Sequence, residues 1–176
     1  MVSAEEAISR SELDLEKANL DRIGVIIGTG IGGIQTLENE HGVYSQRGQR
    51  RVSPFFVPRF IPNIASGNLA IRFGLKGPNH TIISACASGT DAIGCAARTI
   101  QYGDADVMIT GGSEASITGL TIYGFANIKA LSTKNDSPES ASRPFDLERD
   151  GFVLGEGAAG LVLEDEEHAK NRNATI

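Results

Sequence analysis

The chain has 176 residues, enough for one domain with a substantial hydrophobic core. Its 16 Lys and Arg against 22 Asp and Glu side chains give a net charge of −6, which argues against a general nucleic-acid binder. No apolar run approaches the roughly 18 residues of a membrane-spanning helix, and the first residues lack the regions of a signal peptide, so we expect a cytoplasmic protein with no membrane partner.

The first half of the chain alternates between helical and strand-like segments. Residues 4–18 are polar and predict a helix, and residues 22–28 form an apolar run typical of a strand that is buried on both faces. A glycine-rich turn and a helix over about 34–44 follow. Residues 46–58 are basic and then aromatic, which predicts a loop. Pro62 suits the first turn of the helix that we predict over 62–73.

The second half continues this alternation. The pattern of apolar residues predicts a strand at 81–84, a helix at 87–102 and a buried strand at 105–110. A pair of glycines follows this buried strand, and we expect the strand to end there. A polar connection at 135–144 leads to a last strand at 157–164. Strands that alternate with helices predict βαβ units, and therefore an α/β fold with a mostly parallel mixed sheet and helices on both faces.

The turn from Gly28 to Gly33 matches the pattern G-x-G-x-x-G, after a strand and before a helix. Alone, this pattern suggests a dinucleotide site. Such a site needs an acidic residue about 20 positions further on, where residues 50–53 are two arginines, a valine and a serine. A tight glycine turn that lines a pocket is therefore favoured, and a nicotinamide-binding protein is the weaker alternative.

Cys86 is the strongest candidate for a functional residue. It lies between the strand at 81–84 and the helix that begins near Ala87, close to the unpaired N–H groups at the helix N-terminus. This position favours the nucleophilic thiolate, and small neighbours allow a substrate carbonyl to approach the backbone. A buried structural cysteine is the alternative, and the spacing alone does not decide between the two.

Cys95 is the second of two cysteines and lies within the predicted helix, which presents an apolar stripe at Ile93, Ala97 and Ile100. We expect an inert packing residue. Two cysteines without a Cys-x-x-Cys spacing argue against a disulfide framework and against a zinc site.

A cysteine nucleophile usually needs a nearby base or electrophile, most often a histidine. The chain has 3 histidines. His80 precedes Cys86 along a strand and lies too far away, roughly 20 Å at about 3.3 Å per residue. His41 and His168 lie in polar stretches and are expected at the surface, so the sequence offers a nucleophile without an evident base.

Several motifs identify a family. They include Gly-Thr-Gly-Ile-Gly-Gly at 28–33, Arg-Arg-Val-Ser-Pro-Phe-Phe-Val-Pro at 50–58, Ser-Ala-Cys-Ala-Ser-Gly at 84–89 and Arg-Asp-Gly-Phe-Val-Leu-Gly-Glu-Gly at 149–157, with further stretches at 103–112, 130–133 and 143–146. Together they resemble the elongating β-ketoacyl-acyl carrier protein synthases, most closely the synthase II group of bacterial fatty-acid synthesis. The resemblance covers nearly the whole chain from about Arg22.

The resemblance implies a thiolase-like fold, with residues 1–176 forming a partial N-terminal domain, the N-terminal half only, truncated at both ends. Cys86 would accept an acyl group from the phosphopantetheine of acyl carrier protein. The acyl thioester would then condense with malonyl-carrier protein, losing CO2 to give a 3-oxoacyl product. No other cofactor and no metal are implied. The family's decarboxylating histidines come from the C-terminal half, so we expect the chain alone to be inactive.

The resemblance also suggests where the family's first strand would lie. We expect it in the middle of the sheet, between the strands at 22–28 and 105–110. Without it, the sheet would leave backbone N–H and C=O groups unpaired.

Further positions carry over from the family. Ile31 matches the residue that gates the acyl pocket near the dimer interface, and Phe56 matches an aromatic residue that lines this pocket; core packing is the alternative for both. Arg50, Arg51 and Lys129 match basic positions at the tunnel mouth, where an acidic carrier protein would dock; a solvated loop is the alternative for the two arginines.

The expected partners are acyl carrier protein and, in the intact family, a second copy of the chain. The competing hypothesis is a non-catalytic module for dimerisation or carrier-protein docking. Three acidic residues of the last motifs are assigned structural roles, namely Asp146, Asp150 and Glu156.

Overall fold

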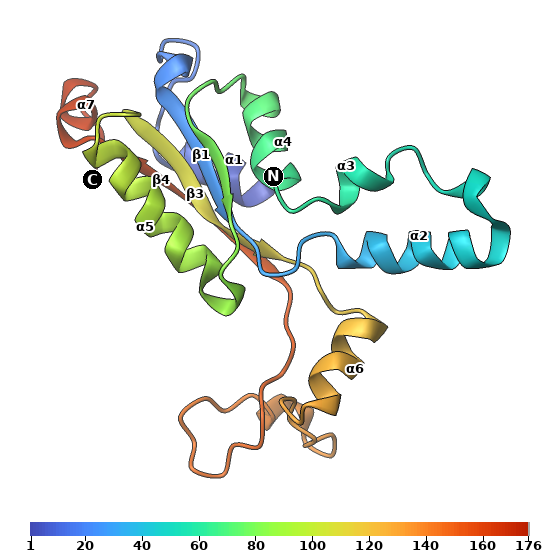
Figure 1. The fold of residues 1–176 in the computed structure, drawn as a ribbon. Helices are drawn as coiled ribbons and strands as arrows, with labels where there is room; N and C mark the ends of the chain where they lie inside the picture. The colour runs from blue at the N-terminus through green and yellow to red at the C-terminus, as the bar shows by residue number, and fades with distance from the viewer. Residues whose placement is uncertain (176) are drawn as a thin grey trace.

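A four-stranded mixed sheet forms the centre of the computed structural model, which describes residues 1–175 (Figure 1). The strands are β1 (Ile23–Gly28), β2 (Asn79–Ile82), β3 (Val107–Glu114) and β4 (Gly157–Glu164), in the order β2-β1-β3-β4. β1 is parallel to β2 and to β3, whereas β4 is antiparallel to β3.

Helices and short 3-10 turns connect the strands. The helices are α1 (Val2–Arg10), α2 (Ile34–Arg47), α3 (Phe56–Phe60), α4 (Ile64–Phe73), α5 (Ser88–Gln101), α6 (Gly119–Asn127) and α7 (Glu166–Asn171). The 3-10 turns are η1 (Leu20–Arg22), η2 (Gln49–Arg51), η3 (Ala85–Ala87) and η4 (Pro138–Ser140). None of the helices in the described part of the chain combines the length and the apolar character that crossing a membrane requires.

Successive residues of β1 face opposite sides of the sheet, as the geometry of a strand requires. Val25 and Ile27 belong to a hydrophobic cluster that includes residues of α1 and α4. Ile26 belongs to a second cluster that includes residues of α5. The sheet is therefore covered by α1 and α4 on one face and by α5 on the other, which confirms the predicted α/β architecture.

The two central strands supply the largest fully buried side chains of the core. Val25, Ile26, Val107, Met108 and Ile109 each expose 1% of their surface or less. Burying one such side chain contributes about 1.5–3 kcal/mol to the free energy of unfolding. The apolar runs that predicted strands buried on both faces are therefore the residues that hold the layers together.

The prediction of a missing middle strand is wrong. β1 and β3 are hydrogen-bonded neighbours along their whole shared length, from Ile23 opposite Val107 to Gly28 opposite Gly112. Both strands carry apolar residues on both faces, so they fit the centre of the sheet side by side. The edges of this sheet are β2 and β4.

Several predicted boundaries also need correction, and the strand expected at 81–84 is β2 at Asn79–Ile82. The first helix ends at Arg10, and Glu12 just beyond it has a φ of 54°. The segment expected as a loop at 46–58 contains η2 and the start of α3. The strand expected to end at a pair of glycines continues through them to Glu114. Gly111, at a φ of 141°, fits against β4 because it has no side chain: a Cβ there would lie 2.1 Å from the carbonyl oxygen of Ala159.

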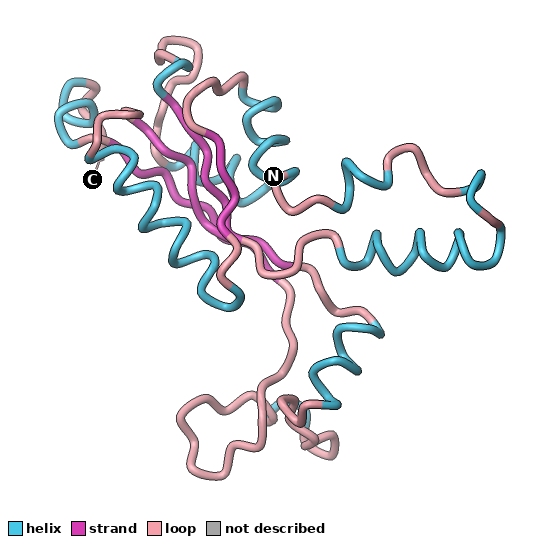
Figure 2. Tube along the Cα trace, in the orientation of Figure 1, coloured by secondary structure: helices cyan, strands magenta, loops and turns pink. Residues whose placement is uncertain are grey.

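Two segments project away from the sheet (Figure 1). α2, η2 and α3 form one arm, and α6 with the loops that follow it forms the other. Most of the chain between α6 and β4 is loop, as Figure 2 shows. Within this loop, an isolated parallel bridge pairs Leu131 with Phe152.

Candidate functional site

Cys86 lies in η3, between the end of β2 and the start of α5, and is exposed. The residue before it, Ala85, has a φ of 53°, a left-handed conformation that is strained for a residue with a Cβ. Ser88 stabilises this sharp turn, because its hydroxyl accepts from the backbone N–H of Ser84 at 2.9 Å and donates to the carbonyl of Ala85 at 2.6 Å. The strand-to-helix corner expected from the sequence is therefore formed.

Glycines let the start of α5 lie directly against the ends of two strands. A Cβ on Gly28 would come within 2.2 Å of the carbonyl oxygen of Ser88. A Cβ on Gly112 would lie 3.2 Å from the Cα of Gly89. The thiol of Cys86 is thus held at the carboxyl ends of β1 and β3, where ligands bind in open α/β sheets.

The thiol opens into a cavity of about 620 Å³. Its walls come from the loop after β1, the η3 turn, the ends of β3 and β4, and two aromatic side chains, Phe125 and Phe152. These two rings meet edge to face with centroids 5.2 Å apart. The residues that line the cavity are Gly28, Thr29, Gly30, Ile31, Ala85, Cys86, Ser88, Gly89, Gly112, Ser113, Glu114, Ser116, Phe125, Phe152, Leu154, Gly155, Gly157, Ala158 and Ala159.

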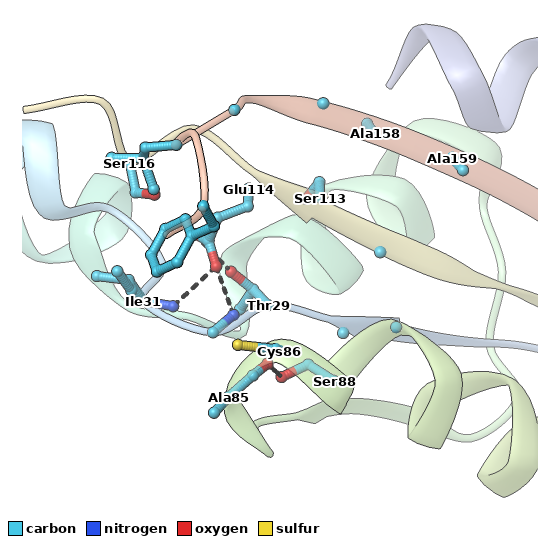
Figure 3. A pocket seen from close by; sticks show the side chains of 18 of the residues that line it. Thr29, Ile31, Ala85, Cys86, Ser88, Ser113, Glu114, Ser116, Ala158 and Ala159 are labelled. Atoms are coloured by element: carbon cyan, nitrogen blue, oxygen red, sulfur yellow. Dashed lines mark hydrogen bonds between the residues drawn. The ribbon is translucent and has the colours of Figure 1, made fainter. Parts of the chain in front are cut away.

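Glu114 is the one carboxylate in this lining, and it faces the glycine-rich loop (Figure 3). One of its oxygens, Oε2, accepts from the backbone N–H groups of Gly30 at 2.6 Å and Ile31 at 3.0 Å. These are the amides that would have to hold a phosphate in a dinucleotide site. Because the protein's own carboxylate already occupies them, the structure argues against the nicotinamide-binding alternative.

The described residues, 1–175, contain no cluster of three or more His, Cys, Asp or Glu side chains that could hold a metal ion. Cys95 lies in α5 and packs against the second hydrophobic cluster, whose buried members include Ile26, Ala92 and Met108. Its expected packing role is confirmed, and the two thiols have different surroundings.

The model of the family described as "Beta-ketoacyl synthase, N-terminal domain" matches residues 1–169. The chain belongs to the β-ketoacyl synthase family. The 3-oxoacyl-[acyl-carrier-protein] synthase 2 of Coxiella burnetii is 53% identical over 176 residues, all of this chain and 42% of the relative. The synthase of the same name from Vibrio cholerae is 53% identical over 171 residues, 97% of this chain and 41% of the relative. The chain thus spans less than half the length of these relatives.

Solved structures agree with this family. One is a type II PKS acyl-carrier protein in complex with its ketosynthase bound to the hexaketide; it matches 98% of this chain and 44% of its own with a TM-score of 0.92 at 34% identity. A β-ketoacyl synthase from Burkholderia phymatum matches 100% of this chain and 45% of its own with a TM-score of 0.81 at 35% identity. The thiolase-like fold implied by the sequence motifs is therefore confirmed.

The β-ketoacyl synthase chain brings some of the predicted site residues together and leaves others apart. Ile31 lines the Cys86 cavity, and its contact with an acyl group stays a prediction. Phe56 does not line it; its ring stacks on Phe60 within α3, with centroids 5.5 Å apart. Substrate contact by Phe56 stays a prediction.

The three basic residues predicted to bind a carrier protein are all exposed. Arg50 and Arg51 lie in η2, at the far end of the α2 arm, and Lys129 follows α6 with a φ of 58°. They therefore come from the two arms that project from the sheet (Figure 1).

None of the 3 histidines lines the Cys86 cavity. His41 is exposed, as expected, and His80 is exposed as well. His168 is not a simple surface residue, because its Nδ1 lies 2.5 Å from the buried carboxylate of Glu164, which also binds Arg172. It belongs to α7 and packs that helix against the sheet.

Two acidic residues assigned structural roles do hold loops in place. Asp150 accepts from the hydroxyl of Ser132 at 2.7 Å and the backbone N–H of Thr133 at 2.9 Å. Glu156 accepts from the backbone N–H of Ile117 at 2.8 Å. Both carboxylates shape the loops beside the cavity and neither lines it.

Sequence reasoning missed Glu114, the residue that organises the glycine-rich loop. A signal was available, since Glu114 ends the strand parallel to β1 and the carboxyl ends of parallel neighbours share one edge of the sheet. The aromatic pair Phe125 and Phe152 was also missed. The two rings lie far apart in the sequence, and no local pattern indicates that they meet.

Proposed function

We propose that this chain carries the acyl-accepting nucleophile of a β-ketoacyl-acyl carrier protein synthase, and that Cys86 is that nucleophile. The observation that supports this most is the exposed thiol in a tight turn at the start of α5, open to a cavity of about 620 Å³ with mostly apolar walls. An apolar cavity beside a nucleophile suits an acyl chain whose carbonyl end must reach the sulfur.

The first reaction is acyl transfer. The Cys86 thiolate attacks the carbonyl carbon of an acyl thioester, and a carbon–sulfur bond forms while negative charge develops on the carbonyl oxygen. When this intermediate collapses, the original carbon–sulfur bond breaks and the carrier thiolate leaves and takes up a proton. N–H groups at the start of α5 lie where they can stabilise the developing charge.

The second reaction is condensation. A malonyl thioester loses CO2, and the resulting carbanion attacks the acyl carbonyl on Cys86, expelling the cysteine thiolate and giving a 3-oxoacyl thioester. This step needs groups that promote decarboxylation, a task that histidine can perform as a hydrogen-bond donor. None of the described residues that line the cavity is a histidine, so we expect acyl loading from this chain but no condensation.

Acyl carrier protein is the proposed partner. Arg50, Arg51 and Lys129 are exposed basic side chains on a chain whose net charge is −6, and an acidic carrier protein would be attracted to them. The solved relative that pairs a ketosynthase with an acyl-carrier protein supports this partner. The interaction should weaken as ionic strength rises.

We further infer that two copies of the chain associate through β2. This strand pairs with β1 along one edge and has no strand on its other edge within residues 1–175. Ile83 beside it is 58% exposed. An open strand edge next to an apolar side chain favours pairing with a second chain. Sedimentation equilibrium should show a dimer that Ile83→Lys weakens, and a monomer at every concentration would contradict this inference.

Acyl loading is tested by mass spectrometry of the chain after incubation with an acyl thioester of acyl carrier protein. We expect one acyl group per chain, located on the peptide that contains Cys86. Cys86→Ala should abolish it, and Cys95→Ala, the matched control, should leave it unchanged. If Cys86→Ala is still acylated, the nucleophile assignment is wrong. If the wild type binds carrier protein but takes up no acyl group, the docking-module hypothesis is the better one.

A further inference from the structure

The carboxylate of Glu114 connects the end of β3 to the loop that follows β1. Oε2 accepts the backbone N–H groups of Gly30 and Ile31, at 2.6 and 3.0 Å. Oε1 accepts the hydroxyl of Thr29 at 3.3 Å. Three consecutive residues are therefore bound to one ionised side chain, and hydrogen bonds to an ionised acceptor are roughly twice as strong as neutral ones.

A hydrogen bond within the loop stabilises its turn beside this carboxylate. The hydroxyl of Thr29 accepts the backbone N–H of Gly32 at 3.2 Å. Gly30 leaves room for the carboxylate, because a Cβ there would lie 2.9 Å from Oε2 of Glu114. The path of the backbone at Ile31 thus depends on where Glu114 lies.

Glu114 stands in the wall between two cavities. It lines the Cys86 cavity and also a second cavity of about 520 Å³. Thr29 lines both cavities as well, whereas Ile31 lines only the first. The second cavity extends toward α4 and has apolar walls at Ile61, Pro62, Ile64 and Ala65. If the loop moved, the Cys86 cavity could extend into this apolar space.

We propose that Glu114 is a positioning residue that holds the loop at residues 29–31 in place between the two cavities, with Ile31 lining the first, and thereby limits the length of the acyl chain that Cys86 accepts. The proposal rests on the proposed function, because it concerns the acyl site of the same cysteine. It assigns Glu114 no contact with the reacting atoms. Its role is to fix the loop, and the charge of the carboxylate matters only through the hydrogen bonds that it strengthens.

The test uses two alkylating reagents, N-methyl- and N-octyl-iodoacetamide, which need no acyl-transfer chemistry. In each reaction the Cys86 thiolate displaces iodide and forms a carbon–sulfur bond, while the thiol proton goes to the buffer. Peptide mass spectrometry gives the ratio of octyl to methyl rates at Cys86, with Cys95 as the internal reference. The full chain is compared with Glu114→Ala, Glu114→Gln and Glu40→Ala.

The control variant removes a similar interaction elsewhere. Glu40 accepts the backbone N–H of Ser53 at 2.8 Å and lines neither cavity. Glu114→Gln keeps a carbonyl oxygen that can accept the N–H groups of Gly30 and Ile31, so it preserves the loop and removes only the charge.

In Glu114→Ala the octyl-to-methyl ratio at Cys86 should rise about threefold or more, since several hydrogen bonds to the loop are lost together. In Glu114→Gln it should rise less, because neutral hydrogen bonds to the loop remain, and in Glu40→Ala it should stay near the wild-type ratio. An unchanged ratio in Glu114→Ala would overturn the proposal. So would a rise of equal size in Glu114→Gln, which would assign the effect to charge, or in Glu40→Ala, which would assign it to general loosening.

Hydrogen exchange provides a second measurement. The amides of Gly30 and Ile31 should exchange faster in Glu114→Ala and by a smaller factor in Glu114→Gln; wild-type exchange in Glu114→Ala would overturn the proposal. If Glu114→Ala does not fold, Glu114→Asp keeps the charge on a shorter side chain and should show the same direction of change in the ratio. Acyl loading is measured in parallel, so an unacylated wild type with a shifted alkylation ratio would remove the proposed function and leave the positioning role in place.

Discussion

The hydroxyl of Ser88 donates to the carbonyl of Ala85 at 2.6 Å, across the residue that carries the exposed thiol. The same hydroxyl accepts the backbone N–H of Ser84 at 2.9 Å, so one buried side chain that follows Cys86 binds two backbone groups that precede it. The nucleophile's position is therefore set by a residue within the first turn of α5.

Replacing Ser88 by Ala should loosen this turn. Both hydrogen bonds of a side chain that is 3% exposed are lost, so the N–H of Ser84 and the carbonyl of Ala85 lose this partner. We expect the free energy of unfolding to fall by about 1–3 kcal/mol and the alkylation of Cys86 to change, measured by urea unfolding and by peptide mass spectrometry. Thr99→Ala is the matched control, because the hydroxyl of Thr99 donates to the carbonyl of Cys95 at 2.9 Å. An equal effect of both variants on Cys86 would contradict this role.

Ala85 offers a test of backbone strain at the nucleophile. Its φ of 53° suits glycine better than any residue with a Cβ. Ala85→Gly should leave the free energy of unfolding within about 1 kcal/mol of the wild type, whereas the β-branched Ala85→Val should lower it by about 1–3 kcal/mol. Urea unfolding of the two variants measures this difference. If the valine variant is as stable as the glycine variant, the turn is not strained at this residue.

Two glycines of the chain should respond in opposite ways to alanine. At Gly28 a Cβ would meet the carbonyl oxygen of Ser88 at 2.2 Å, so Gly28→Ala must push α5 away from β1. We expect a loss of several kcal/mol, as overpacking of backbone against backbone cannot relax locally. Gly94 lies inside α5 with nothing within 4 Å of its Cβ position, and Gly94→Ala should gain up to about 1 kcal/mol. Thermal unfolding of both variants measures these changes in stability. If Gly28→Ala is as stable as the wild type, α5 does not lie as close to β1 as the structure shows.

Several features of the fold and site could be predicted because short stretches of sequence encode them. The apolar runs of β1 and β3 indicate buried strands, and Cys86 lies between a β-branched stretch and a helical one. The order of the strands could not be predicted in this way. Nothing in the sequence of β1 says which parallel strand lies beside it, and the resemblance led us to expect a gap between β1 and β3 that direct pairing rules out.

The same limit applies to contacts between distant residues. Glu114 meets Gly30 only because their strands are neighbours, and the prediction that the glycine turn lines a pocket did not include the carboxylate that holds it. Phe56 was expected in the pocket from the family motif, yet within this single chain it stacks on Phe60. A motif identifies a residue's family position and does not by itself identify its neighbours.

Acid should release the loop that Asp150 holds. The hydroxyl of Ser132 is the main cause that lowers the pKa of Asp150 to about 2, with the N–H of Thr133 and the nearby Arg143 adding to it. A carboxyl whose pKa falls on folding stabilises the folded loop above its ordinary pKa of 3.8, and this stabilisation is lost as the pH falls from there toward 2. Hydrogen exchange at the amide of Thr133 should therefore gain protection, relative to an unbonded amide, as the pH rises through this window. Asp150→Asn should flatten that dependence, and an unchanged profile in this variant would show that another group controls the loop.

The ion pair that packs α7 against the sheet gives a final prediction. Burial of Glu164 raises its pKa, but hydrogen bonds from Arg172 and His168 outweigh this and lower it below the ordinary value of 4.5. Arg172 binds both oxygens of the carboxylate at 2.7 Å, so Glu164→Gln leaves a partly buried guanidinium without its counter-charge. We expect the free energy of unfolding to fall by about 1–3 kcal/mol at neutral pH.

The wild type should lose this stability as the pH drops below 4.5, and the difference in the free energy of unfolding between wild type and Glu164→Gln should shrink with it. Urea unfolding of both proteins at neutral and acidic pH measures this, with Glu167→Gln on the exposed side of α7 as the control; a difference that does not depend on pH would assign the effect to packing instead of charge.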